Sequence, residues 1–140
     1  VYQGRYSMLD RDVERSGVLA QAAEAGAGFV AFSPLAQGLL TSRYLDGVIP
    51  EGSRASKGRF LKSTDITPEL VARLNALNDM AKRRGQTLDE MALAWVLKNS
   101  GVTSVIVGSS SVAQLADSLR CLDNLKFTDE ECRECDLLTL

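Results

Sequence analysis

The stretch GFVAF at residues 28–32, which stops at Ser33 and Pro34, decides the fold class that this sequence predicts. It is a short, continuous apolar run, as expected of a strand buried on both faces of a parallel sheet, and its short length argues against a helix. Residues 16–25 precede it and predict a short amphipathic helix, with Ser16 as N-cap and Gly26 just beyond its end. Helix and strand therefore alternate early in the chain.

The rest of the chain continues this alternation around one long irregular stretch. Val1–Gln3 has the pattern of a strand end. Between residues 36 and 67 the apolar periodicity disappears, and we expect a surface loop with a short helix near residues 38–44. Loops of this length in compact domains are usually functional or disordered.

Four further helices and one strand are predicted after this loop. Thr87 and Glu90 have the spacing of a capping box, which predicts that a helix begins there and ends before Gly101. The other helices are predicted over residues 67–84, 111–122 and 128–138, and the strand over residues 102–107.

Alternating helices and strands predict a parallel sheet of which only about three strands are visible. Because an isolated sheet of this kind would leave its edge strands unpaired, we expect part of a closed barrel or of a larger sheet. Half a barrel is the simplest interpretation. The chain also lacks an initiator methionine, and Val1–Gln3 has the pattern of a strand already in progress, so we expect a fragment of a longer chain.

Composition narrows the class of protein. The chain has 45% hydrophobic and 24% charged residues and a net charge of −2, which predicts a globular domain without the basic surface that nucleic acid requires. No apolar run is long enough for membrane insertion, and no signal peptide is visible, so a cytoplasmic location is expected. Cys121, Cys132 and Cys135 are expected to be free thiols, and with no histidine present a metal site at Cys132 and Cys135 is not expected.

Three segments that follow the strands carry the candidate site residues, since ligands bind at the carboxyl ends of parallel strands. The amide of Gln3 offers the donors and acceptor that a nicotinamide carboxamide needs. Phe32 could stack on a flat ring, with small residues after it that admit a phosphate. From the residues alone, however, the alternative that Phe32 belongs to the core is favoured.

The third segment, residues 108–114, places a glycine and three serines before the N-terminus of a helix. Free backbone N–H groups and the helix dipole make such a segment suitable for an anion, although the serines could equally serve as helix caps alone. The long loop adds five cations that would suit a polyphosphate, or that could form a solvated loop surface. They are Arg43, Arg54, Lys57, Arg59 and Lys62.

These residues, taken in order, resemble the aldo-keto reductase superfamily, and most closely bacterial reductases similar to voltage-gated potassium channel β subunits. The resemblance covers essentially all 140 residues. It rests on Gln3-x-x-Tyr6, on Phe32-Ser33-Pro34-Leu35-Ala36-x-Gly38-Leu39-x-Thr41, on Ser53-Arg54-Ala55-Ser56 and on Gly108-Ser109-Ser110-x-x-x-Gln114.

The resemblance implies an α/β fold that forms the C-terminal part of a (β/α)8 TIM barrel, from the end of strand six to the helix after strand eight. Residues 1–140 would form a single partial domain that carries the cofactor-binding side of the barrel. The helices at residues 67–84 and 128–138 would be the two extra helices that the family places outside the barrel.

The resemblance also implies an NADP site, with NAD as the alternative cofactor. Gln3 would hold the carboxamide of the nicotinamide, and Phe32 would stack on its ring. The other implied positions are Ser33, Pro34, Leu35 and Gly38 along the pyrophosphate, Arg43 and Arg54 at the cofactor phosphates, and Gly108, Ser110 and Gln114 at the adenosine end.

Three positions in the predicted helix at residues 111–122 bear on cofactor choice. Asp117 replaces the usual glutamate of the family's adenosine site conservatively. Ser118 stands where an asparagine usually meets the adenine, and Ser111 stands where many members have a basic residue for the 2′-phosphate. The loss of one charge-assisted hydrogen bond there could lower affinity for the phosphorylated cofactor about ten- to a hundredfold.

No catalytic residue is predicted in this chain. The family's proton-donating tyrosine, with its aspartate, lysine and histidine, lies on earlier strands, and Tyr2, Tyr6 and Tyr44 do not match that tyrosine. We therefore expect a parent oxidoreductase that reduces aldehydes or ketones, of which this fragment alone is inactive. The alternatives are a regulatory, nucleotide-sensing β-subunit-like protein and a truncated non-catalytic product. The expected partner is a small carbonyl substrate, and an oligomer is compatible with the sequence.

Overall fold

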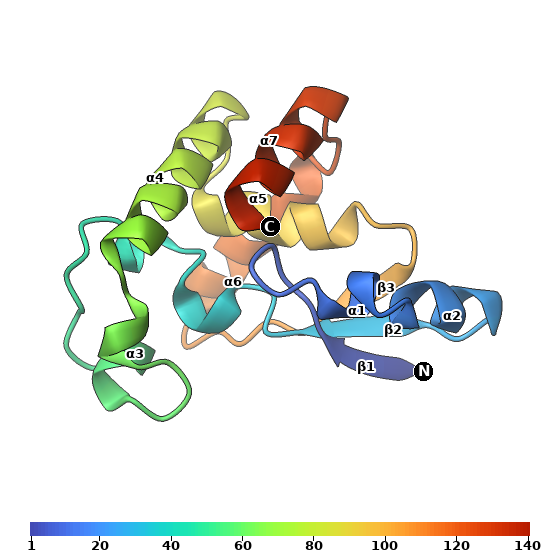
Figure 1. Cartoon of the computed structure of the whole chain (residues 1–140), viewed down its shortest axis with the longest axis horizontal. Coiled ribbons are helices and arrows are strands. Elements are labelled where there is room, and N and C mark those ends of the chain that lie inside the picture. Colours follow the sequence, from blue (N-terminus) through green and yellow to red (C-terminus); the bar gives the residue numbers. More distant parts are fainter.

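Three parallel strands with helices packed around them form the framework of the protein (Figure 1). The structure, a computed structural model, describes all 140 residues. The strands β1 (Tyr2–Arg5), β2 (Phe29–Phe32) and β3 (Val102–Val105) follow one another in the sheet in the order β1-β2-β3. The predicted α/β class with a parallel sheet is confirmed.

Strand β1 is longer than the sequence indicated. Gln3 was predicted at the end of the strand, yet pairing with β2 continues from Tyr2 to Arg5, which lies in register with Phe32. Gln3 therefore lies within β1, paired with Val30.

Two short helices, α1 (Asp12–Arg15) and α2 (Val18–Glu24), connect β1 to β2. The prediction that Ser16 caps the second helix was wrong. Its hydroxyl donates a 2.7 Å hydrogen bond to the carbonyl of Asp12 and so closes α1. Gly17, with a φ of 76°, takes the N-cap position of α2 instead, because the chain must reverse between the two helices in a left-handed conformation.

The expected loop at residues 36–67 is more ordered than its sequence suggested. It contains the short helix α3 (Arg54–Lys57) and three 3₁₀ turns, η1 (Ala36–Gly38), η2 (Ser42–Tyr44) and η3 (Ser63–Asp65). Tyr44 is fully buried, and its hydroxyl accepts a hydrogen bond from the N–H of Ala55. This contact, which joins residues 11 positions apart, holds α3 near η2 without any local periodicity.

The later helices begin where their predicted caps lie. They are α4 (Pro68–Arg83), α5 (Leu88–Leu97), α6 (Val112–Leu119), with the 3₁₀ turn η4 (Arg120–Asp123) after it, and α7 (Asp129–Thr139). The side chains of Thr67 and Ser111 cap α4 and α6. Thr87 with Glu90, at the start of α5, forms a complete capping box, in which each side chain accepts a hydrogen bond from the other residue's backbone N–H.

The main core lies between one face of the sheet and helix α5. Phe29 and Ala31 on β2 are fully buried, as are Tyr6 and Trp95, whose ring centres lie 5.4 Å apart. Side chains alternate between the faces of a strand, so the other face carries Gln3, which is exposed, and Phe32, which is half-buried. The sheet is therefore covered by this chain on one face only.

Helices α4 and α7 lie side by side, away from the sheet (Figure 1). Cys135 on α7 is buried against α4, with its sulfur 3.7 Å from that of Met80. The next residue on α7, Asp136, forms a salt bridge with Arg11, whose Nη1 lies 2.5 Å from the carboxylate. This salt bridge connects α7 to the segment after β1. None of the helices is both long and apolar enough to span a membrane.

Candidate functional site

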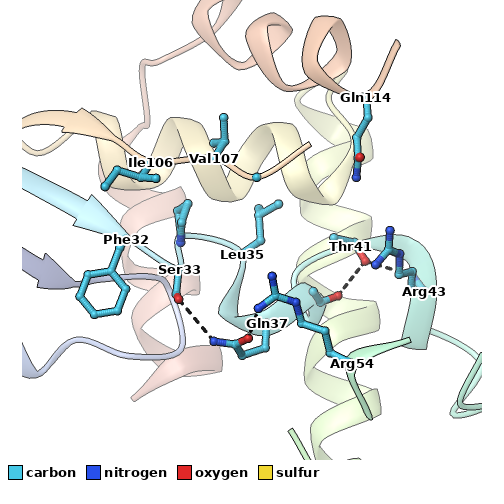
Figure 2. Close-up of a pocket in the computed structure, with 13 residues that line it drawn as sticks. Phe32, Ser33, Leu35, Gln37, Thr41, Arg43, Arg54, Ile106, Val107 and Gln114 are labelled. Carbon is cyan, nitrogen blue, oxygen red and sulfur yellow. Dashed lines mark hydrogen bonds between the residues drawn. The ribbon is translucent and has the colours of Figure 1, made fainter. Parts of the chain in front are cut away.

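A cavity of about 320 Å³ lies at the carboxyl ends of β2 and β3. This volume is at the lower end of the range for small-molecule sites. Figure 2 shows the Phe32 ring at one end of the cavity and Arg43 and Gln114 at the other. The residues that line it are Phe32, Ser33, Pro34, Leu35, Gln37, Gly38, Thr41, Arg43, Arg54, Ile106, Val107, Gly108 and Gln114.

The turn after β2, residues 33–38, forms one wall in an unusual backbone conformation. Ser33, Ala36 and Gln37 have φ values of 54°, 48° and 62°, and no other non-glycine residue in the chain has a positive φ. Such conformations cost about 1–3 kcal/mol each and cluster at functional sites, where the surrounding structure enforces them. We call residues 33–38 the β2 turn.

Two arginines give the cavity a positive charge. Arg43 and Arg54 line it, and the lining contains no aspartate or glutamate. Neither guanidinium forms a salt bridge within this chain, although six other lysines and arginines do. Both side chains are exposed. The cavity can therefore attract an anion with charges that no carboxylate neutralises.

Neutral groups orient the Arg54 guanidinium and hold the backbone of the turn that carries Arg43. Nη1 of Arg54 donates a hydrogen bond to Oε1 of Gln37, whose Nε2 lies 3.4 Å from the hydroxyl of Ser33 (Figure 2). Thr41 caps the turn that carries Arg43, accepting a 3.3 Å hydrogen bond from its N–H and donating a 2.7 Å one to Gly38. The guanidinium groups keep most of their donors for a ligand.

The N-terminus of α6 lies at the far end of the cavity. Ser111 accepts a 3.1 Å hydrogen bond from the N–H of Gln114, so it acts as the N-cap. Oε1 of Gln114 accepts bonds of 2.8 and 3.0 Å from the N–H and hydroxyl of Ser110, which orders the segment between β3 and α6. Val112 and Ala113, in the first turn, have no intrahelical partner for their N–H groups. This end offers donors and a positive helix dipole to an anion.

Gln3 and Phe32 share the uncovered face of the sheet. Arg5 pairs with Phe32, and Gln3 lies two residues earlier on the same side of β1. The guanidinium carbon of Arg5 lies 6.0 Å from the centre of the Phe32 ring. A flat ligand that stacks on Phe32 would therefore lie on the face of the sheet that also carries Gln3.

Most of the sequence-predicted site residues come together at this cavity. Those that line it are Phe32, Ser33, Pro34, Leu35, Gly38, Arg43, Arg54, Gly108 and Gln114. Gln3 and Ser110 lie outside the lining, although Ser110 contacts Gln114. Asp117 and Ser118 also lie outside the lining. Asp117 forms a 2.7 Å salt bridge with Arg120, and the hydroxyl of the buried Ser118 donates a hydrogen bond to the carbonyl of Gln114.

Four lining residues were not among the predicted sites: Gln37, Thr41, Ile106 and Val107. Ile106 and Val107 were assigned to a strand at residues 102–107, yet β3 ends at Val105 and the two residues follow it along the cavity. Their place in the sequence could have predicted them as site residues, because they come directly after a parallel strand. Gln37 had no local signal beyond its place among small residues.

Comparison with known proteins identifies the family. A model of the aldo/keto reductase family matches residues 1–139. The chain belongs to the aldo/keto reductase family. A solved structure of a thermostable aldo-keto reductase in complex with the inhibitor epalrestat superimposes on 97% of this chain and 38% of its own, with a TM-score of 0.65 and 25% sequence identity. The three strands and their helices are thus part of a (β/α)8 barrel, as the resemblance implied.

Two curated relatives illustrate the range of proteins to which this chain is similar. L-glyceraldehyde 3-phosphate reductase from Escherichia coli O157:H7 is 44% identical over 140 residues, which cover 97% of this chain and 40% of that protein. A probable voltage-gated potassium channel subunit beta from Oryza sativa subsp. japonica is 31% identical over 133 residues, with 94% and 40% covered. The chain spans about 40% of the length of the curated relatives it matches.

The tyrosine of the Gln3-x-x-Tyr6 motif has a structural role in this chain. Tyr6 is fully buried, and its hydroxyl donates a hydrogen bond to the carboxylate of Glu14. Burial, reinforced by this bond, raises the pKa of Tyr6 well above its ordinary value. The hydroxyl therefore stays protonated and engaged within the core, where it cannot serve a substrate.

Proposed function

We propose that this chain is the cofactor-binding, C-terminal part of an NADP(H)-dependent reductase of aldehydes or ketones. One observation carries the proposal: a cavity at the carboxyl ends of two barrel strands holds two arginines without carboxylate partners. Membership of the aldo/keto reductase family supports the reaction class.

The chemistry of the donors fits the phosphates of a dinucleotide. Arginine forms bidentate, charge-assisted hydrogen bonds to phosphate, and Arg43 and Arg54 both face the cavity. The first turn of α6 adds backbone N–H groups at the same end. A phosphorylated ligand would therefore meet several hydrogen-bond donors and no carboxylate along this wall.

The other end of the cavity fits a flat, amide-bearing ring. Phe32 would stack on the nicotinamide, and the amide of Gln3 would bind its carboxamide, as the family resemblance implies. Phe32 is only half-buried and lines the cavity, which supports this assignment because part of the residue remains accessible to a ligand. Ser33, Pro34, Leu35 and Gly38 would then follow the pyrophosphate between the two ends.

The bound cofactor would supply a hydride to the carbonyl carbon of the substrate. This chain's residues would bind the cofactor, orient its ring and keep its phosphates in place. The chain contains no histidine, and Tyr6 is occupied in the core, so the proton donor would come from another part of the protein. Residues 1–140 alone would bind the cofactor without reducing a substrate.

Within this proposal, the site prefers NADP over NAD. Arg43 and Arg54 favour the cofactor with the additional phosphate. Ser111, in contrast, uses its hydroxyl to cap α6 and offers no charge to a 2′-phosphate. We expect NADPH to bind more tightly than NADH, by less than in relatives with a basic residue at this position.

A regulatory role is the second candidate. The relative from Oryza sativa is named as a probable channel subunit beta, and that similarity motivates a nucleotide-sensing function for the whole protein. Such a protein would retain its cofactor tightly and turn over slowly.

The experiment is to purify the full-length protein that includes this chain and to follow NADPH absorbance with a panel of aldehydes, including L-glyceraldehyde 3-phosphate. Substrate-dependent oxidation of NADPH supports the reductase. Tight NADPH binding without oxidation by any aldehyde favours the regulatory role. Absence of binding to NADPH and NADH alike contradicts both candidates.

A further inference from the structure

We propose that Gln37 is a positioning residue that holds Arg54 at the cavity with a neutral amide, so that the full charge of Arg54 remains available to a cofactor phosphate. The proposal rests on the proposed function, because it assigns a role toward the same ligand.

Gln37 bridges two segments that are separate in the chain. Its Oε1 accepts a hydrogen bond from Nη1 of Arg54, 17 residues later, and its Nε2 lies 3.4 Å from Oγ of Ser33. Arg54 is the first residue of α3, a four-residue helix on the exposed loop. Without this bridge, the long and exposed Arg54 side chain would populate many rotamers. Fixing one of them on ligand binding would cost conformational entropy and so lower the affinity.

The chemical type of residue 37 is important. A glutamate there would bind Arg54 more strongly than an amide, but it would also neutralise the guanidinium and place a negative charge next to the phosphate. An amide has the acceptor that orients Arg54 and no charge. Gln37 therefore orients the cation without weakening the attraction between the cavity and an anion.

The backbone supports a functional reason for this residue. Gln37 has a φ of 62° and Ser33 a φ of 54°, and the side-chain bond between them spans the β2 turn. Glycine or asparagine would adopt a left-handed conformation at lower cost, yet neither side chain could reach both partners. The strain at Gln37 is consistent with a requirement for a long amide side chain at this place.

The test measures the dissociation constant of NADPH by fluorescence titration of the full-length protein. The variants are Gln37→Met, Gln37→Glu, Arg54→Met and the double variant with Gln37→Met and Arg54→Met. Methionine keeps the length of the side chain and its unbranched Cβ, so the backbone strain is unchanged and only the hydrogen bonds are lost. Gln21→Met, at an exposed position on α2, is the matched control.

We expect Gln37→Met to raise the dissociation constant about three- to tenfold, the effect of one lost hydrogen bond. Gln37→Glu should raise it further, although its contact with Arg54 is stronger. The double variant should match Arg54→Met within about twofold, because Gln37 acts through Arg54. The control variant should bind like the wild type.

Three outcomes would overturn the inference while leaving the proposed function intact. They are unchanged NADPH affinity of Gln37→Met, tighter binding by Gln37→Glu than by the wild type, and additive effects in the double variant. Failure of the wild-type protein to bind NADPH would instead remove the proposed function itself. Thermal unfolding of each variant checks that a change in affinity is not a loss of fold.

Discussion

Nη1 of Arg84 donates a 2.7 Å hydrogen bond to Oε2 of Glu131, and the Arg84 side chain is only 2% exposed. Its guanidinium carbon also lies 3.7 Å from the centre of the Phe127 ring. The same carboxylate oxygen of Glu131 accepts a 2.8 Å bond from the N–H of Thr128 and so completes the capping box of α7. One carboxylate therefore connects the end of α4 to the start of α7.

This arrangement predicts that Glu131→Gln lowers the free energy of unfolding by about 1–2 kcal/mol, because a charge-assisted bond to a buried arginine becomes a neutral one. Urea denaturation measures the change. Glu134→Gln is the matched control, since Glu134 pairs with Arg83 at the same 2.7 Å but both side chains are more than one-third exposed. The control should change stability by no more than about 0.5 kcal/mol. Equal effects of the two variants would contradict the prediction.

Glu131 also predicts a dependence of stability on pH. Burial alone would raise the pKa of this carboxyl, but the hydrogen bonds from Thr128 and Arg84 outweigh it and lower the pKa below its ordinary value. A lowered pKa in the folded state means that the unfolded chain binds the proton first, so this stabilisation is present above about pH 5 and is lost as the solution becomes more acidic. Between pH 5 and 3 the wild type should lose more stability than Glu131→Gln. Parallel pH profiles of the two proteins would count against this role.

The cysteines should differ in reactivity. Burial raises the pKa of the Cys135 thiol to about 12, whereas Cys132, one helical turn earlier, is half-buried. Because the thiolate is the nucleophile, iodoacetamide at pH 8 should modify Cys132 well before Cys135. Mass spectrometry of peptides after timed labelling measures the order, and labelling in denaturant, where both thiols are exposed, is the control. Equal rates in the folded protein would show that Cys135 is not held in the core.

Gly4 is required by the packing of β1 on β2. A Cβ at this position would lie 2.7 Å from Cζ of Phe29, whose ring is fully buried next to Tyr2. We predict that Gly4→Ala lowers the free energy of unfolding by about 1–3 kcal/mol. Gly108→Ala has no atom within 4 Å of the added methyl group and should leave stability nearly unchanged. Thermal denaturation of both variants checks this, and a stable Gly4→Ala protein would show that the Phe29 ring can move.

The sequence predicted those helices and strands that are marked by a pattern within the element itself. The capping box of Thr87 and Glu90 marked the start of α5, and the apolar run at residues 28–32 marked β2. Helix α1 was missed because four residues carry no periodicity. It is ordered partly by Arg11, which binds both Glu14 and Asp136, 125 residues away. Contacts at such distances along the chain leave no local pattern.

In the candidate site too, local patterns predicted some features, whereas contacts between distant residues determine others. Phe32 and Gly108 could be placed at the cavity because Phe32 ends β2 and Gly108 comes shortly after β3, and both strands are recognisable in the sequence. The orientation of Arg54 could not, because it depends on a hydrogen bond to Gln37 and on a left-handed backbone at a residue that is not glycine. Family resemblance indicated which residue types matter, and the structure adds how they are held.

The measurement that most directly tests the central claim is the dissociation constant of NADPH for the full-length protein and its Arg43→Met variant. The account predicts saturable binding by the wild type and a loss of about ten- to a hundredfold in the variant, because one charge-assisted contact to phosphate disappears. Arg15→Met, at an exposed position on α1, should bind like the wild type. Equal affinity of Arg43→Met and wild type would contradict the assignment of this cavity as the phosphate site.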